Sequence, residues 1–278
     1  MAPCGFSGKE LFVFSFNPIP LEWRQREHLT VMPRVDQTLV ERGLCASREQ
    51  AKRLILAGQV RINGQLAHKP SDQAKAADTV TLAAPEKYVS RGGLKLEHAL
   101  RHFNLPVTEL TAIDLGASTG GFTDCLLQHG AQRVYAVDVG QGQLAWKLRQ
   151  DPRVVVMEKT NARDLTAAAF PAPFSPVKLV VVDCSFISLR KILPAAVALL
   201  QSSGKIVALI KPQFEAGKRE ADKGAGVIRD PAIHERVLQE LRTFVTDELY
   251  LTWTGVVESP LLGPAGNKEF LALIEKLS

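Results

Sequence analysis

A short glycine-rich segment, TAIDLGASTGGFTD (Thr111 to Asp124), constrains the fold of this chain more than any other part of it. An apolar run stops at Gly116, and a loop of small residues then opens a helix expected from Phe122 to His129. At such a turn glycine lets the backbone approach a ligand closely, and the first N–H groups of the helix point toward it. The segment therefore predicts a buried strand, a tight turn and a helix N-terminus that together form a ligand site.

The glycine spacing narrows the kind of ligand. Gly116-x-x-x-Gly120-Gly121 differs from the G-x-G-x-x-G of dinucleotide enzymes, and no Lys-Ser/Thr follows as in phosphate-binding loops. The segment resembles motif I of the S-adenosylmethionine (AdoMet) methyltransferases, which implies AdoMet as the cofactor. A βα connection without any ligand gives a similar pattern, so the neighbouring segments are needed to tell an AdoMet site from an ordinary tight turn. The contact residues implied by the resemblance are Asp114, Gly116, Ala117, Ser118, Thr119, Gly120, Gly121 and Phe122.

From Thr111 onward the hydrophobic pattern alternates between strands and helices. Strands are expected at residues 111–116, 133–138, 154–158, 178–183, 205–211, 250–257 and 269–274. Helices are expected near residues 119–129, 142–150, 188–200 and 231–246. This order predicts an α/β domain with a parallel, doubly wound, Rossmann-like sheet, whose ligands bind in a crevice at the carboxyl ends of the strands.

Candidate nucleoside-binding residues follow the second and third expected strands. Asp138, with Val139 beside it, ends the second strand, where a carboxylate can accept hydrogen bonds from both ribose hydroxyls of a nucleoside. Asn161 and Ala162 follow the third strand, beside the expected adenine position, although Asn161 is also a common turn former. An NAD-dependent dehydrogenase would use Asp138 in the same way, but this chain lacks its G-x-G-x-x-G motif.

Charged residues mark further strand ends. Asp183 ends the fourth strand and Lys211 the fifth, and burying an ammonium group is costly unless it is paired, so Asp183 is the expected partner of Lys211. Glu269 opens the last strand on the same rim. Lys95 lies one turn into a helix expected from Gly93 to Phe103, with Ser90 as a candidate cap. It could point into this cleft, although an isolated helical lysine is more often solvated.

Residues 33–83 predict a small α+β module. Two short helices are expected, from Arg34 to Ala46 and from Ser47 to Ala57, the second with a capping box formed by Ser47 and Gln50. Asn63-Gly64 between apolar pairs is a strong hairpin signal. The order of these features resembles the S4 RNA-binding domain. That resemblance implies RNA phosphate contacts from Arg34, Arg48, Lys52, Arg53 and Arg61, and Arg91 in the next segment is a further candidate.

The charge distribution supports a polyanionic partner. The net charge of +5 lies entirely between Pro33 and Phe103, where 12 Lys and Arg face 7 Asp and Glu. A basic face that binds nucleic acid explains this excess, and an ordinary solvated surface would give the same counts.

The cysteine spacing and the length of the apolar runs indicate which classes of protein the chain can belong to. The four cysteines lie far apart without a C-x-x-C pair, which favours a reduced, cytoplasmic compartment and no metal. No apolar run approaches the roughly 20 residues of a membrane span.

Residues 1–32 are expected to be a poorly ordered extension, with translation starting at Met32 as one explanation. Residues 84–92 are expected to link the S4-like module to a catalytic domain at 93–278. A monomer is compatible with the sequence, which leaves the oligomeric state open.

Four of these charged residues carry a closer resemblance. Lys95, Asp183, Lys211 and Glu269 match, in order and spacing, the K-D-K-E set of FtsJ-type ribose 2′-O-methyltransferases. With the S4-like module and the segment SRGGLKL, residues 33–278 resemble the TlyA (haemolysin A) family. This resemblance implies an AdoMet-dependent enzyme that methylates the ribose 2′-hydroxyl of a cytidine in ribosomal RNA or ribosomal subunits. Lys211 would deprotonate or only orient that hydroxyl.

Other classes remain as alternatives to this reading. They are a membrane-active haemolysin, which the older family name suggests, and an S4-containing RNA-binding protein without catalysis. A pseudouridine synthase also carries an S4 module, but the G-R-L-D-type loop that it needs is absent here.

Overall fold

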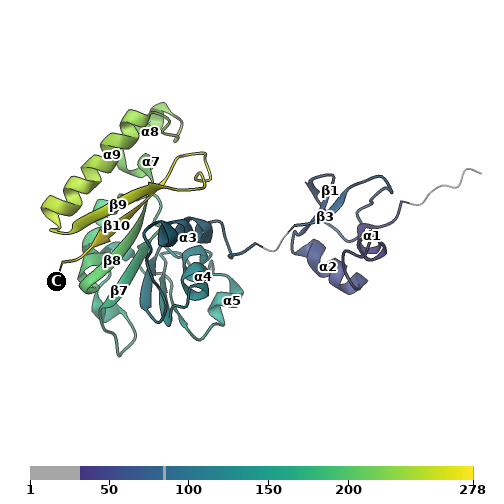
Figure 1. Ribbon diagram of the computed structural model, residues 1–278, viewed down its shortest axis with the longest axis horizontal. Helices are drawn as coiled ribbons and strands as arrows, with labels where there is room; N and C mark the ends of the chain where they lie inside the picture. The colour runs from purple at the N-terminus through teal and green to yellow at the C-terminus, as the bar shows by residue number, and fades with distance from the viewer. Residues whose placement is uncertain (1–31, 84–85, 278) are drawn as a thin grey trace, which may run out of the picture. The chain divides into compact units, whose positions relative to one another are not determined.

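The computed structural model describes residues 32–83 and 86–277, which form two compact units (Figure 1). The second unit begins at Glu86, before the expected domain start at residue 93. Tyr88 explains the difference, because its side chain is buried in the core of this unit and leaves room only for glycine at Gly93. The expected extension at residues 1–32 lies outside the described residues, apart from Met32.

The first unit has the predicted S4-like order of elements. It contains α1 (Val35–Glu41), α2 (Arg48–Leu56), β1 (Val60–Ile62), β2 (Gln65–Leu66) and β3 (Val80–Leu82), with β1 antiparallel to both other strands. Ser47 Oγ accepts the backbone N–H of Gln50 at 3.2 Å, which confirms the predicted cap. Asn63 and Gly64 both adopt positive φ, as the predicted tight hairpin requires.

The second unit is built on a seven-stranded sheet in the order β6-β5-β4-β7-β8-β10-β9 (Figure 1). The strands are β4 (Thr111–Leu115), β5 (Arg133–Val137), β6 (Val154–Met157), β7 (Val177–Val182), β8 (Leu200–Ile210), β9 (Thr252–Glu258) and β10 (Phe270–Glu275). The first five in that order are mutually parallel, as predicted. The sheet is nevertheless mixed, because β10 is antiparallel to both β8 and β9. A loop rather than a crossover helix joins β9 to β10, so these strands cannot be parallel neighbours.

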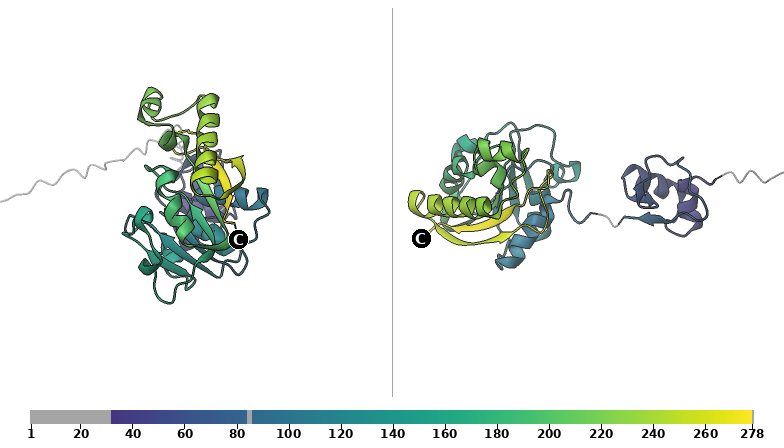
Figure 2. Two further views of the ribbon diagram at one scale, coloured as in Figure 1. Left: turned by 90° about the vertical axis from the view of Figure 1, so that its left-hand side faces the viewer. Right: turned by 90° about the horizontal axis from the view of Figure 1, so that it is seen from above.

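Helices cover both faces of this sheet. One face carries α3 (Gly92–His102), α4 (Gly121–Gln128) and α5 (Trp146–Arg149), whose apolar residues form one core with Ala112, Val181 and Val207. The other face carries α6 (Leu193–Ala198) and α9 (Pro231–Thr243), which pack on Ile113, Val180 and Val182. In Figure 2 the yellow strands β9 and β10 run between α9 and α3. Alternate residues of one strand therefore enter opposite cores, as the two-residue period of a strand requires.

The remaining helices of this unit are short. They are α7 (Pro212–Glu215), α8 (Lys218–Lys223), a π-helical turn at Phe244–Glu248, and 3-10 turns at Ala162–Asp164, Ala167–Ala169 and Leu189–Lys191. The single helix expected at 188–200 is split into a 3-10 turn and α6, with Pro194 in the first turn of α6. In the described ranges, no helix is both long enough and apolar enough to cross a membrane.

Candidate active site

The turn after β4 has the geometry that the glycine spacing predicts. Gly116 and Gly120 have φ of +86° and +95°, a region that side chains with a Cβ rarely adopt. A Cβ at Gly116 would also lie 2.6 Å from the carbonyl oxygen of Asp183, and one at Gly121 would lie 2.2 Å from Ser90 Oγ. Glycine at these positions therefore lets β4, the end of β7 and the segment before α3 meet at one point.

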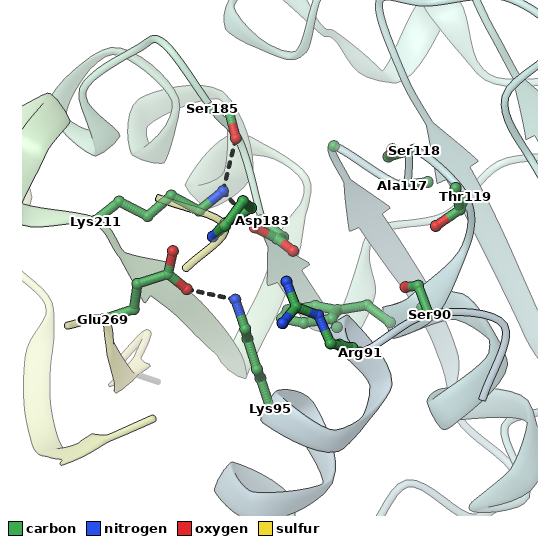
Figure 3. A pocket seen from close by; sticks show the side chains of 15 residues that line it. Ser90, Arg91, Lys95, Ala117, Ser118, Thr119, Asp183, Ser185, Lys211 and Glu269 are labelled. Carbon is green, nitrogen blue, oxygen red and sulfur yellow. Dashed lines mark hydrogen bonds and ion pairs between the residues drawn. The ribbon is translucent and has the colours of Figure 1, made fainter. Parts of the chain in front are cut away.

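A cavity of about 270 Å³ opens at this meeting point (Figure 3). The glycine loop supplies one wall through Gly116, Ala117, Ser118, Thr119, Gly121 and Phe122. The opposite walls carry charge and hydroxyl groups, from Ser90, Arg91, Lys95, Asp183, Ser185, Lys211 and Glu269. Residues from five separate parts of the chain thus face one small space.

All four residues of the predicted K-D-K-E set line this cavity and form two ion pairs. Lys95 Nζ lies 2.5 Å from Glu269 Oε2, and both side chains are buried. Lys211 Nζ lies 2.7 Å from Asp183 Oδ1, which confirms the pairing expected from the sequence. Figure 3 shows the two pairs side by side, with α3 supplying Lys95 and the ends of β7, β8 and β10 supplying or flanking the other three. The catalytic roles of these residues stay predictions.

A second cavity, of about 470 Å³, adjoins the first, and Ser118 and Asp183 line both. Asp138 in its wall accepts hydrogen bonds from Ser118 N at 2.8 Å and from Gly140 N at 2.7 Å. Each carboxylate oxygen keeps a lone pair for a further donor. The predicted residues Val139, Asn161 and Ala162 also line this cavity. Gln143 and Thr160 line it too, and the sequence reasoning did not identify them.

Two predicted cofactor residues, Asp114 and Gly120, line neither cavity. Asp114 lies behind the glycine loop, fully buried, and its Oδ2 accepts a 2.7 Å hydrogen bond from Thr123 Oγ1. Its Oδ1 has no hydrogen-bond partner among the described residues. Burial raises the pKa of Asp114 to about 7, against the opposing bond from Thr123. Asp114 therefore braces the loop from β4 to α4 through Thr123, and its contact with the cofactor stays a prediction.

A third cavity, of about 440 Å³, adjoins Lys211 and Glu269. The aromatic rings of Phe186 and Phe214 lie in its wall with their centroids 5.2 Å apart, and Phe186 is 90% exposed. Asn267 closes another side, where its amide accepts from Ile228 N and donates to Gly226 O, both at 2.8 Å. Lys211 and Glu269, one member of each pair, thus line both the smaller cavity and this larger, partly aromatic one.

Ser185 is the clearest residue that sequence reasoning missed. Its Oγ accepts a 2.7 Å hydrogen bond from Lys211 Nζ, and its side chain lines all three cavities. The only available signal was its place two residues after Asp183 in the strand-end segment DCSFIS.

The expected capping role of Ser90 is wrong. Arg91 is the N-cap of α3, in a helical conformation, and no side chain caps this end. Ser90 instead contributes its backbone carbonyl, which accepts from Gly93 N at 3.2 Å. The reason is the tight packing around Gly92, Gly93 and Gly121, which places the Ser90 hydroxyl against α4 and in the wall of the cavity.

The residues predicted to bind RNA differ in their surroundings. Arg34 and Arg48 both form 3.0 Å ion pairs with Asp36, which is fully buried, so these two also stabilise the first unit. Arg61 donates to the carbonyl of Gly64 in its own hairpin. Lys52 and Arg53 project from the exposed face of α2. Arg91 lies in the second unit and lines the 270 Å³ cavity.

Within residues 32–83 and 86–277, no group of three or more His, Cys, Asp or Glu side chains has an arrangement that could hold a metal ion. His98 and His102, at helical spacing, stack with their ring centroids 6.3 Å apart.

Comparison with known families and structures is consistent with this geometry. The family model of the FtsJ-like methyltransferases matches residues 88–276, and that of the S4 domain matches residues 33–80. The chain is 50% identical over 239 residues to the candidate rRNA methyltransferase YqxC of Bacillus subtilis, covering 86% of this chain and 84% of the relative. It is also 50% identical over 240 residues to the 16S/23S rRNA (cytidine-2′-O)-methyltransferase TlyA of Mycobacterium tuberculosis, covering 85% and 87%. Among solved structures, a candidate hemolysin from Streptococcus thermophilus aligns with a TM-score of 0.68 and 46% identity over 89% of each chain.

Proposed function

The chain belongs to the FtsJ-like methyltransferase family, and we propose that it transfers a methyl group from AdoMet to the 2′-hydroxyl of a cytidine ribose in ribosomal RNA. The observation that carries this proposal is the convergence of two buried or half-buried lysine–carboxylate pairs on one cavity beside the glycine loop. Relatives at 50% identity that are named as rRNA methyltransferases support the substrate class.

The residues present fit AdoMet. The left-handed conformation of Gly116 brings the loop backbone against Asp183, and this loop lines both the 270 Å³ and the 470 Å³ cavities, which leaves its backbone open to a ligand. We assign the adenosine to the 470 Å³ cavity, with its ribose hydroxyls on Asp138 and its base near Asn161 and Ala162. The methionine portion would lie along the glycine loop, in the 270 Å³ cavity. When bound, AdoMet supplies a methyl group activated by the positive sulfur.

The four charged residues then act on the target ribose. Lys211 would orient the 2′-hydroxyl and stabilise the negative charge that grows on its oxygen, because fixed charges act strongly in a site shielded from water. The hydroxyl proton would pass by way of the Lys211 ammonium group to the paired Asp183 carboxylate. Asp183 holds the ammonium group of Lys211, and the Lys95–Glu269 pair lies beside it in the wall of the cavity. Much of the acceleration would come from holding the oxygen in line with the methyl group.

The first unit would supply affinity for RNA. S4-like modules recognise structured RNA mainly through its shape and backbone, and the exposed basic residues of α2 suit phosphate contacts. A ribose inside a helix is hidden by stacking, so we expect the target nucleotide to leave its stack before transfer. The 440 Å³ cavity beside Lys211 is the space available to its base. Ribosomal subunits as substrates imply a cytoplasmic enzyme.

The test is transfer of tritiated methyl groups from AdoMet to separate small and large ribosomal subunits. Lys211→Ala is expected to abolish transfer while calorimetry still detects AdoMet binding. Lys205→Ala is the matched control, because Lys205 lies in β8, the strand that leads to Lys211, but pairs with Glu275 at 3.7 Å, away from the three cavities. Normal turnover by Lys211→Ala would refute the assignment. Liposome leakage by the same preparation, without methyl transfer, would favour the haemolysin alternative.

A further inference from the structure

Ser185 is not one of the four charged residues of the site, but it contacts one of them. It lies in the loop after β7, two residues beyond Asp183, and its hydroxyl accepts a 2.7 Å hydrogen bond from Lys211 Nζ (Figure 3). Its side chain is exposed, and it lines the 270, 470 and 440 Å³ cavities alike. It therefore stands where the assigned adenosine, methionine and target spaces meet.

The contact with Ser185 limits how the Lys211 ammonium group can point. A lysine side chain is flexible, and its ammonium group carries three N–H donors. Asp183 Oδ1 and Ser185 Oγ both lie 2.7 Å from Nζ. With the charge held against Asp183 and one N–H directed at Ser185, the direction of the remaining donors is set. Without the hydroxyl, the ion pair alone would leave the ammonium group free to turn about the carboxylate.

The loop that carries Ser185 is itself held in place. Phe186, the next residue, has φ of +63°, a conformation that bulky residues adopt only when the surroundings impose it. Glu215 at the end of α7 braces the loop, because its carboxylate accepts from Ser188 Oγ at 2.6 Å and from Leu189 N at 2.8 Å. The loop after β8, which begins with Lys211, is thus tied to the loop after β7 at two points.

We propose that Ser185 is a positioning residue for methyl transfer, which orients the Lys211 ammonium group toward the 2′-oxygen of the target ribose. This inference rests on the proposed function. Ser185 acts through Lys211, so its removal should slow the transfer step and leave the binding of both substrates unchanged.

The test compares two substitutions of nearly the same shape, Ser185→Thr and Ser185→Val, which differ in the hydroxyl. For each variant, three quantities would be measured: the rate of methyl transfer to ribosomal subunits, the affinity for AdoMet and the KM for the subunit. A lost hydrogen bond to a charged group corresponds to a fall in kcat of about tenfold to hundredfold for Ser185→Val. The kcat of Ser185→Thr should stay within about threefold of the wild-type value, because threonine keeps the hydroxyl that accepts from Lys211. Dissociation constants for AdoMet and subunit KM should change less than twofold in both.

Ser188→Ala provides the control for the loop itself, because it removes a hydroxyl that binds Glu215 and leaves the Ser185–Lys211 bond in place. It is expected to lower the melting temperature and to leave kcat close to that of the wild type. An equal fall in kcat for Ser185→Thr, Ser185→Val and Ser188→Ala would show a general dependence on loop order and overturn the proposal. Unchanged kcat in Ser185→Val would overturn it as well. A wild-type protein that transfers no methyl group would refute the proposed function instead, so the two failures are distinguishable.

Discussion

Lys95 Nζ and Glu269 Oε2 lie 2.5 Å apart although 174 residues separate them along the chain. The lysine projects from α3 and the glutamate stands at the start of β10, and both side chains are buried beside the glycine loop. An unpaired buried charge is costly, so each residue depends on the other. This contact ties α3 to the start of β10, in addition to the apolar packing of the helix on the sheet, and completes the wall of the cavity.

The first prediction concerns the stability of this pair. Lys95→Met leaves Glu269 without its partner and is expected to reduce the free energy of unfolding by about 3 to 5 kcal/mol. The double variant Lys95→Met/Glu269→Gln should recover much of that loss, because no buried charge remains. Lys268→Met is the control, since Lys268 forms an exposed pair with Glu258 and should cost about 1 kcal/mol or less. Urea unfolding measures all three, and additive losses in the double variant would contradict the coupling.

The second prediction concerns Asp138 and the ribose of the cofactor. Asp138→Ala should weaken AdoMet binding by about tenfold to hundredfold, because hydrogen bonds from hydroxyls to a carboxylate are lost. The decisive comparison uses an S-adenosylhomocysteine analogue that lacks both ribose hydroxyls. Calorimetry should show that the wild type discriminates against this analogue and that Asp138→Ala does not. Equal discrimination by both proteins would place the ribose elsewhere.

The third prediction concerns pH and Asp114. Burial raises the pKa of Asp114 to about 7 in the folded protein, above its ordinary value near 3.8. Between these values the folded state holds a proton that the unfolded state has released, so this group lowers stability as pH rises through that window. Asp114→Asn removes the titration. Its stability relative to the wild type should therefore increase from pH 4 to pH 7, by up to about 4 kcal/mol, and then level off.

Chemical unfolding of both proteins at several pH values checks the prediction for Asp114. A constant difference between wild type and Asp114→Asn across this range would show that Asp114 ionises normally in the folded protein.

The fourth prediction separates structural from RNA-binding arginines in the first unit. Arg53→Ala removes an exposed charge on α2 and should weaken rRNA binding uniformly, with the slope of log affinity against log salt reduced by about 1. Arg48→Ala removes a partner of buried Asp36 and should also lower the melting temperature. Filter binding at several salt concentrations and thermal unfolding measure the two effects. An unchanged salt slope in Arg53→Ala would exclude Arg53 from the interface.

Local patterns in the sequence predicted the parts of this fold that depend on neighbouring residues. The turn from Gly116 to Gly121, the cap at Ser47 and the hairpin at Asn63-Gly64 all follow from residues a few positions apart. The antiparallel placement of β10 did not follow, because a strand's direction depends on its partners and not on its own alternation. The expected cap at Ser90 failed for a similar reason, since packing around Gly92 and Gly93 decides how α3 begins.

The site was predictable where residue type was unusual for its position. A lysine at the end of a buried strand required a carboxylate, and Asp183 was identifiable as its partner. Lys95 and Glu269 were matched through a family resemblance, because no local pattern shows that two distant residues will meet. Ser185 was missed because a serine after a strand is common and its contact with Lys211 exists only in three dimensions.

The most direct test of the central claim is the identity of the methylated nucleoside. Ribosomal subunits treated with the protein and AdoMet would be digested to nucleosides and analysed by mass spectrometry, with Lys211→Ala and Lys205→Ala in parallel. We expect 2′-O-methylcytidine from the wild type and from Lys205→Ala, and none from Lys211→Ala. A methyl group on a base, or equal 2′-O-methylcytidine from Lys211→Ala, would contradict the account.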